Sequence, residues 1–135
     1  MTAYTPAKLE LELPPEPTSV TAARAATTEL ARRVGAPEEE VALAVSEAVG
    51  NAVMHAFRGR EGGTITVRAR GERGRLIVTV TDDGIGMTPN LDSTGLGLGI
   101  SLITKMALDV RFDASSEGTS VSMGFPTRGT EGKAA

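Results

Sequence analysis

The sequence contains no cysteine, no tryptophan and a single histidine among its 135 residues. Without cysteine the chain can form no disulfide framework, no zinc ribbon and no thiol nucleophile, and one histidine leaves few options for a transition-metal site. Aromatic residues are limited to three Phe and one Tyr, so the chain has little with which to stack nucleic-acid bases. The hydrophobic core must therefore be built from Leu, Val, Ile and Ala.

The chain also lacks a strong charge of one sign and a long apolar run. A net charge of -3, from 14 basic and 17 acidic residues, is too small and too mixed to attract nucleic acid or an anionic membrane. No apolar run approaches the roughly 20 residues that a membrane span needs, and the first residues (MTAYTPAKLELEL) do not have the pattern of a secretory signal. We therefore expect a cytoplasmic protein with no direct nucleic-acid or membrane partner, and the length corresponds to about one domain.

Alternation of apolar and polar residues predicts several strands separated by turns. The predicted strands cover residues 8–13, 64–70, 75–82, 109–114 and 119–125. Gly71-Glu72-Arg73-Gly74 lies between the second and third of these and is typical of a hairpin turn. In both hairpin strands the apolar side chains share one face, so we expect one face of the sheet to be packed and the other to be solvated.

Helical periodicity predicts three helices. The first begins at a Thr18 or Ser19 cap and ends at Gly35; its apolar stripe consists of Val20, Ala23, Ala26 or Thr27, Leu30 and Val34. The second begins at Pro37 and runs to about His55, with a stripe of Val41, Val45, Ala48, Val49 and Ala52. The third begins near residues 97–99 and includes Ala107, and residues 127–135 are expected to fray.

The order of these elements is not the strict alternation of a doubly wound parallel fold. It predicts an α/β two-layer sandwich, with the helices on one face of a mixed, mostly antiparallel sheet. We expect one domain over residues 1–135, with a flexible tail from residue 126.

One edge of the second predicted helix is polar. Glu47, Asn51 and His55 repeat at every fourth position, away from the apolar stripe. The amide oxygen of Asn51 is suited to Mg²⁺, which takes few protein ligands, and Glu47 could act as a general base. The alternative is an ordinary exposed polar edge that ends in a helix-terminal His55.

A second candidate site lies where the predicted strand 75–82 ends. Alternation places Asp82 on the inward face, where a carboxylate needs a partner. Gly84 and Gly86 follow, and glycine allows a sharp turn and a close approach to a ligand. An inward carboxylate can accept a hydrogen bond from the N6 amine of adenine, whereas guanine presents an acceptor there. A simple strand-end turn is the alternative.

A glycine-rich loop leads directly into the third predicted helix. Residues 93–100 (STGLGLGI) include Thr94, Gly95, Leu96, Gly97, Leu98 and Gly99. Free N–H groups at a helix N-terminus bind phosphate. The loop is not a Rossmann fingerprint, because Ile100 replaces the third glycine, and it lacks the Lys of a P-loop. It could instead be only a mobile surface loop. Further on, alternation places Thr119 on the inward face, where its hydroxyl could reach an adenine directly or through water. An ordinary threonine at the start of a strand is the alternative.

In this order and at these spacings, the motifs resemble those of the GHKL (Bergerat-fold) ATPases, which include gyrase, MutL and histidine kinases. Residues 47–52 (EAVGNA) are similar to the N box and residues 82–87 (DDGIGM) to the G1 box. Residues 95–99 (GLGLG) are similar to the G2 box, and Gly118-Thr119 to the last motif. The length, and residues 43–56 (LAVSEAVGNAVMHA) in particular, are similar to the anti-sigma factor serine/threonine kinases of bacterial partner switching.

The resemblance implies an ATP-binding anti-sigma factor that sequesters a sigma factor and, with Mg²⁺ and ATP, phosphorylates a serine of an anti-anti-sigma factor. It implies Glu47 as the catalytic base or water-polarising group and Asn51 as the Mg²⁺ ligand. The other residues implied in cofactor binding are His55, Asp82, Gly84, Gly86, Met87, Thr94, Gly95, Leu96, Gly97, Leu98, Gly99 and Thr119. A homodimer is expected from the same resemblance.

The sequence departs from the family pattern in one respect. No Lys or Arg lies between Asp82 and Lys105, where family kinases often carry an Arg that stabilises the transferring phosphate. A non-catalytic ATP-binding regulatory module of the same fold is therefore the alternative function.

Overall fold

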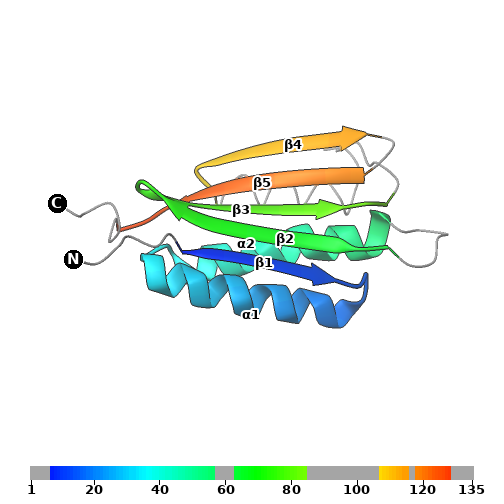
Figure 1. Ribbon diagram of the computed structural model, residues 1–135, viewed down its shortest axis with the longest axis horizontal. Helices are drawn as coiled ribbons and strands as arrows, with labels where there is room; N and C mark the ends of the chain where they lie inside the picture. The colour runs from blue at the N-terminus through cyan, green and yellow to red at the C-terminus, as the bar shows by residue number, and fades with distance from the viewer. Residues whose placement is uncertain (1–6, 57–62, 85–106, 116–117, 129–135) are drawn as a thin grey trace.

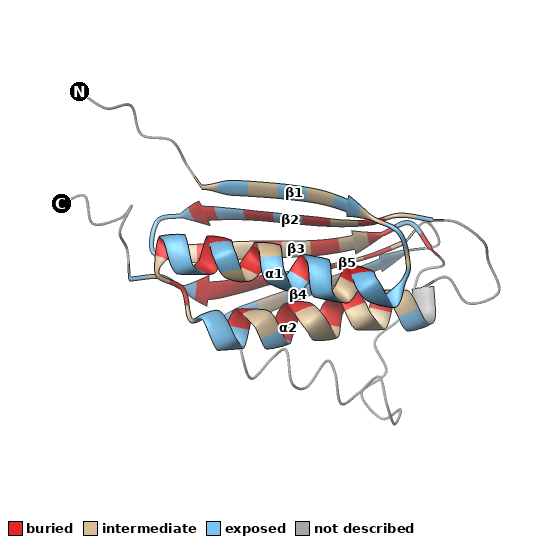
Figure 2. Cartoon of the chain, turned by 90° about the horizontal axis from the view of Figure 1, so that it is seen from below, coloured by how far each residue is buried: buried red, intermediate tan, exposed pale blue. Residues whose placement is uncertain are grey.

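The computed structural model describes residues 7–56, 63–84, 107–115 and 118–128. In this part of the chain, two helices pack on one face of a five-stranded sheet (Figure 1). Figure 2 shows the helices α1 and α2 side by side across the same face of the sheet. This arrangement confirms the predicted α/β two-layer sandwich.

The sheet is antiparallel at every described pairing. Its strands are β1 (Lys8–Leu13), β2 (Ile65–Glu72), β3 (Arg75–Asp82), β4 (Asp109–Ser115) and β5 (Gly118–Pro126), and their order is β1-β2-β3-β5-β4. The expectation that the sheet is mixed is therefore wrong for this part of the chain. The reason is that β5 lies between β3 and β4, which run in the same direction, so these two strands do not become neighbours.

The hairpin between β2 and β3 is tighter than predicted. Pairing continues through Gly71 to Glu72, which lies opposite Arg75. The turn therefore consists of Arg73 and Gly74 rather than of residues 71–74. Gly74 has a φ of +70°, a conformation that glycine adopts without steric cost.

Helix α1 (Pro17–Val34) begins earlier than predicted. Its N-cap is Glu16, which makes no side-chain capping hydrogen bond, and the expectation of a Thr18 or Ser19 cap is wrong. Proline favours the first helical position because its φ is already helical and it has no N–H to satisfy. The Ser19 side chain is instead buried, and its hydroxyl donates to the Pro14 carbonyl at 2.5 Å. The helix ends as predicted at Gly35, whose φ is +79°.

Helix α2 (Glu38–Asn51) is followed by a π-helical turn, η1 (Ala52–Ala56), so the α-helix ends before the predicted His55. The predicted buried stripe of this segment is confirmed, since Val41, Val45, Ala48, Val49 and Ala52 are all buried. The stripe of α1 is confirmed in part. Ala23, Thr27, Leu30 and Val34 are buried, whereas Val20 and Ala26 are only partly buried.

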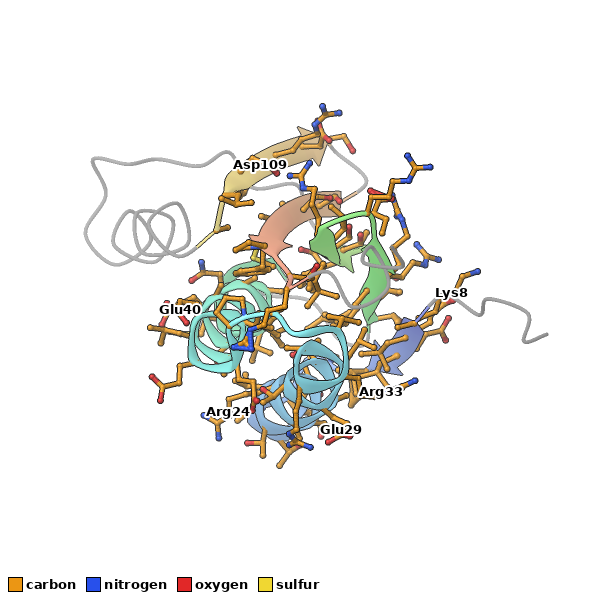
Figure 3. All side chains as sticks on the ribbon, turned by 90° about the vertical axis from the view of Figure 1, so that its left-hand side faces the viewer. Lys8, Arg24, Glu29, Arg33, Glu40 and Asp109 are labelled. Carbon is orange, nitrogen blue, oxygen red and sulfur yellow. The ribbon has the colours of Figure 1, made fainter. Side chains whose placement is uncertain are left out.

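The core lies between the helices and the inward face of the sheet. Its largest fully buried side chains include Phe125, Leu76 and Met123 from the sheet and Val41 and Val45 from α2. The rest of the core is dominated by small aliphatic residues, as the shortage of aromatics predicts. Charged side chains of both signs, including the labelled Arg24, Glu29, Arg33 and Glu40, project from the outer surface of the helices (Figure 3).

The residues that follow β5 are held in place. The Thr127 N–H donates to the Gly74 carbonyl at 3.0 Å, and the Arg128 N–H donates to the Gly35 carbonyl at 3.0 Å. The expectation that the chain frays from residue 126 or 127 is therefore wrong for residues 126–128, because two turns of the fold supply acceptors. Residues 129–135 and the predicted third helix lie outside the described residues, apart from Ala107, which lies in a bend.

Candidate nucleotide-binding site

Asp82 is the last residue of β3 and faces the core, as the strand alternation predicts. The residue is only 5% exposed. Its Oδ1 atom accepts a hydrogen bond from the Gly84 N–H at 3.0 Å. Burial raises the pKa of Asp82 above its ordinary value, and the neighbouring Asp83 raises it further, while the backbone N–H groups of Gly84 and Thr119 act in the opposite direction.

The start of β5 lies against the end of β3. Thr119 is opposite Asp82 in the antiparallel register and is also buried. Gly118 has a φ of +145°, and a Cβ atom at this position would collide with the Asp82 carbonyl oxygen and lie 3.1 Å from its carbonyl carbon. Glycine at position 118 therefore allows β5 to pass close over Asp82. The structure thus brings together the two residues that the sequence predicts at adenine.

A recess of about 420 Å³ lies at this corner of the sheet. It is lined by residues of β3, β4 and β5, including Asp82, Ala114, Ser115 and Thr119. The ion pairs found in the described ranges all lie elsewhere and none involves Asp82. A buried carboxylate without a cationic partner is suited to accept a hydrogen bond from a neutral donor, such as an exocyclic amine.

The polar edge of α2 ends near the same corner. Glu47 and Asn51 are both half-buried and lie in the last turns of α2. Figure 1 shows the C-terminal end of α2, the end of β3 and the start of β5 at the same end of the molecule. The fold therefore brings the residues of the N box to the end of the sheet that carries Asp82. His55 lies in η1, and its side chain is outside the described residues.

The donor groups at this end of the molecule suit magnesium better than a transition metal. Among the described residues there is no group of three or more His, Cys, Asp or Glu side chains that could hold a metal ion. Mg²⁺ usually keeps several waters and takes one or two protein oxygen ligands together with substrate phosphates. The Asn51 amide oxygen fits this requirement, and its assignment to Mg²⁺ stays a prediction.

Several predicted site residues fall outside the described part of the chain. These are Gly86, Met87, Thr94, Gly95, Leu96, Gly97, Leu98 and Gly99. Their roles at the nucleotide stay predictions. Gly84 is described, and it lies in the turn that follows β3, where its N–H binds the Asp82 side chain.

Sequence reasoning missed one residue of this corner, Asp83. Its Oδ1 atom accepts a hydrogen bond from the Thr64 N–H at 2.8 Å, and its own N–H donates to the Thr64 carbonyl at 3.3 Å. The sequence does carry a signal for it, because a second carboxylate directly after an inward one must point to the other face of the strand end.

No helix in the described ranges is long and apolar enough to cross a membrane.

The chain matches the family described as "Histidine kinase-like ATPase domain" over residues 13–125. It is 34% identical over 135 residues to the serine-protein kinase RsbW of Listeria innocua serovar 6a, and the match covers 86% of this chain and 85% of that relative. It is also 30% identical over 74 residues to the anti-sigma F factor of Halalkalibacterium halodurans, with 45% of this chain and 51% of the relative covered.

Two solved structures share the fold. The structure of the RsbU and RsbW domains of Rv1364c from Mycobacterium tuberculosis aligns with a TM-score of 0.62 at 24% identity, covering 92% of this chain and 34% of that one. The histidine kinase domain of the Erythrobacter litoralis EL346 blue-light activated histidine kinase aligns with a TM-score of 0.59 at 24% identity, covering 84% of this chain and 61% of that one. At this level of identity the two structures bear on the fold alone.

Proposed function

We propose a function from the premise that this chain belongs to the histidine kinase-like ATPase domain family and, within it, to the serine-protein kinases of the RsbW type. It is an anti-sigma factor kinase of a partner-switching system. It holds a sigma factor inactive and transfers the γ-phosphate of ATP to a serine of an anti-anti-sigma factor. It acts in the cytoplasm as a homodimer, through protein partners rather than through nucleic acid or membrane.

The observation that carries the nucleotide assignment is the buried Asp82 carboxylate. It is 5% exposed and borders the recess at the corner of β3, β4 and β5. Its partners in this corner are backbone N–H groups. A carboxylate has several acceptor positions, so it can also accept a hydrogen bond from the adenine N6 amine. Guanine has an acceptor at the corresponding position and would be repelled. The Thr119 hydroxyl would contact the same base directly or through water.

The polar edge of α2 would supply the groups that act on the phosphates. Asn51 would hold Mg²⁺, which when bound neutralises charge on the phosphate oxygens. Glu47 lies one helical turn before Asn51, and it would accept the proton of the attacking serine hydroxyl or polarise it. Residues 94–99 would bind the phosphates through backbone N–H groups, and His55, Gly84, Gly86 and Met87 would complete the cofactor site.

Phosphoryl transfer by this chain has to proceed without an Arg or Lys between Asp82 and Lys105. The developing charge must then be compensated by Mg²⁺, by backbone N–H groups, or by Lys105, Arg58 or Arg60. A module of the same fold that binds ATP without transferring phosphate would bind the nucleotide equally well. Transfer of the γ-phosphate to a serine of a verified partner distinguishes the kinase from that module.

The first test is a calorimetric titration of the protein with ATP and with GTP, each with and without Mg²⁺. We expect binding of ATP that depends on Mg²⁺ and little binding of GTP, because Asp82 selects a donor at the base. Equal binding of ATP and GTP would contradict the role of Asp82. Binding of ATP that is indifferent to Mg²⁺ would contradict the role of Asn51, and absence of ATP binding would contradict the nucleotide site as a whole.

A further inference from the structure

The strand ends at this corner are joined by a pair of hydrogen bonds that the sheet register does not include. Pairing of β2 with β3 ends at Ile65 opposite Asp82. One position further, the Thr64 N–H donates to the Asp83 side chain at 2.8 Å, and the Asp83 N–H donates to the Thr64 carbonyl at 3.3 Å. Asp83 therefore continues the ladder by one position, with its carboxylate in place of a backbone acceptor.

This pair of bonds holds the peptide through which Asp82 is oriented. The Gly84 N–H donates to Asp82 Oδ1 at 3.0 Å, and the position of that N–H depends on how the chain turns at Asp83. On the other side, β5 passes close to the backbone of Asp82 at Gly118, and the Thr119 N–H also acts on the Asp82 carboxylate. The carboxylate is thus oriented by backbone N–H groups on two sides, and the Gly84 N–H is the one whose position depends on Asp83.

We propose that Asp83 is a positioning residue for the nucleotide base: by binding Thr64 it fixes the Gly84 N–H, which in turn directs the Asp82 carboxylate toward the N6 amine of adenine. This inference rests on the proposed adenine site and adds to it a residue that makes no contact with the base.

Two further observations favour a positioning role over a purely stabilising one. The bond between Thr64 and Asp83 is exposed to solvent, so water can replace it at little cost to the stability of the fold. In addition, the charge of Asp83 raises the pKa of Asp82 and so opposes ionisation of the group that binds the base. The charge of Asp83 thus works against the site, so the contribution of this side chain lies in the acceptor oxygen that binds the Thr64 N–H.

The test compares binding of ATP with binding of purine riboside 5′-triphosphate, which lacks the N6 amine. Wild type should prefer ATP. We expect Asp83→Ala to reduce this preference by about tenfold, since a hydrogen bond to a charged group contributes about that factor to affinity. The reduction should come from a lower affinity for ATP, with the affinity for purine riboside 5′-triphosphate unchanged. Asp83→Asn keeps an acceptor for the Thr64 N–H and should retain the preference. Glu39→Ala removes an exposed carboxylate at the far end of α2 and serves as the matched control.

The outcomes are distinguishable. The inference is overturned if Asp83→Ala keeps the preference of wild type for ATP. It is also overturned if the substitution lowers the affinity for both nucleotides equally, because an equal loss indicates a general disturbance of the site and not a lost contact with the N6 amine. If wild type itself shows no preference for the amine, the proposed adenine site fails, and the positioning role fails with it. If Asp83→Ala does not fold, as judged by thermal denaturation, Asp83→Glu takes its place. It keeps the charge but displaces the acceptor, and the same loss of preference is expected.

Discussion

At the scale of single residues, the buried carboxylate of Asp82 destabilises the fold and is at the same time suited to bind the nucleotide base. Its carboxylate is buried at the end of β3, and within the described part of the chain its partners are backbone N–H groups rather than a cation. Burial of a charge without a cation is unfavourable, and the raised pKa of Asp82 expresses that cost. Residues that destabilise a fold in this way are typical of functional sites.

The pKa of Asp82 leads to a prediction about stability. A carboxyl whose pKa is higher in the folded than in the unfolded state binds more protons in the folded state between the two values. The free energy of unfolding of wild type should therefore rise, relative to that of Asp82→Asn, as the pH falls through this window, and the advantage should be lost as the pH rises above it. Urea denaturation of both proteins across the acidic range measures the difference. Parallel pH profiles would show that Asp82 is not protonated more readily in the folded state.

At the scale of elements, α2 divides its sides between packing and chemistry. One side carries the stripe of Val41, Val45, Ala48 and Val49, which is buried in the core. Another carries Glu47 and Asn51, which stay half-buried in the last turns of the helix. Because the packed side is held by the core, the polar side is presented at a defined position near the end of β3 (Figure 1).

This division predicts that the roles of Glu47 and Asn51 can be distinguished by substituting each residue alone, and that neither substitution unfolds the protein. Asn51→Ala should lower the Mg²⁺-dependent affinity for ATP by about tenfold or more, since it removes an oxygen ligand. Glu47→Ala should leave ATP affinity unchanged and slow phosphoryl transfer by about 10²-fold to 10⁴-fold, as expected for loss of a general base. Calorimetry and a single-turnover transfer assay to the partner serine measure the two effects. Normal turnover by Glu47→Ala would refute its role as the base.

At the scale of the whole molecule, the two ends of the sandwich have different constraints. One end carries the corner of Asp82, Gly118 and Thr119. At the other end, the segment after β5 is held against the turns at Gly35 and Gly74. Arg128 packs closely against Gly35, since a Cβ atom at position 35 would lie 3.0 Å from the Arg128 Cβ. The chain that leaves β5 therefore ties the helical layer to the hairpin of β2 and β3.

We expect a chain that ends at Pro126 to be less stable than a chain that ends at Arg128, because it loses the backbone hydrogen bonds from Thr127 and Arg128. At about 1 kcal/mol for each bond, the loss should be about 2 kcal/mol in the free energy of unfolding. Thermal or urea denaturation of the two truncated proteins measures it, and the full chain serves as the reference. Equal stability of the two would mean that these bonds form at no net gain over their hydration.

The sequence by itself determined the elements and most of their faces. Alternation predicted the inward position of Asp82 and Thr119, and helical periodicity predicted the buried side of α2, because these patterns depend only on local geometry. The motif order also led to the family, through spacing along the chain. The N-cap of α1 and the turn between β2 and β3 were predicted less well. Several residues near Ser19 could begin the helix, and several turns within residues 71–74 could connect the strands, at similar energy.

Only the tertiary structure decided which strands are neighbours and what holds the site. The insertion of β5 between β3 and β4 makes the sheet antiparallel and places Thr119 opposite Asp82. The collision that a side chain at Gly118 would cause, and the bond between Thr64 and Asp83, join residues far apart in the chain. No local pattern encodes such contacts, because they arise only when the packing of the core brings separate strand ends to the same corner.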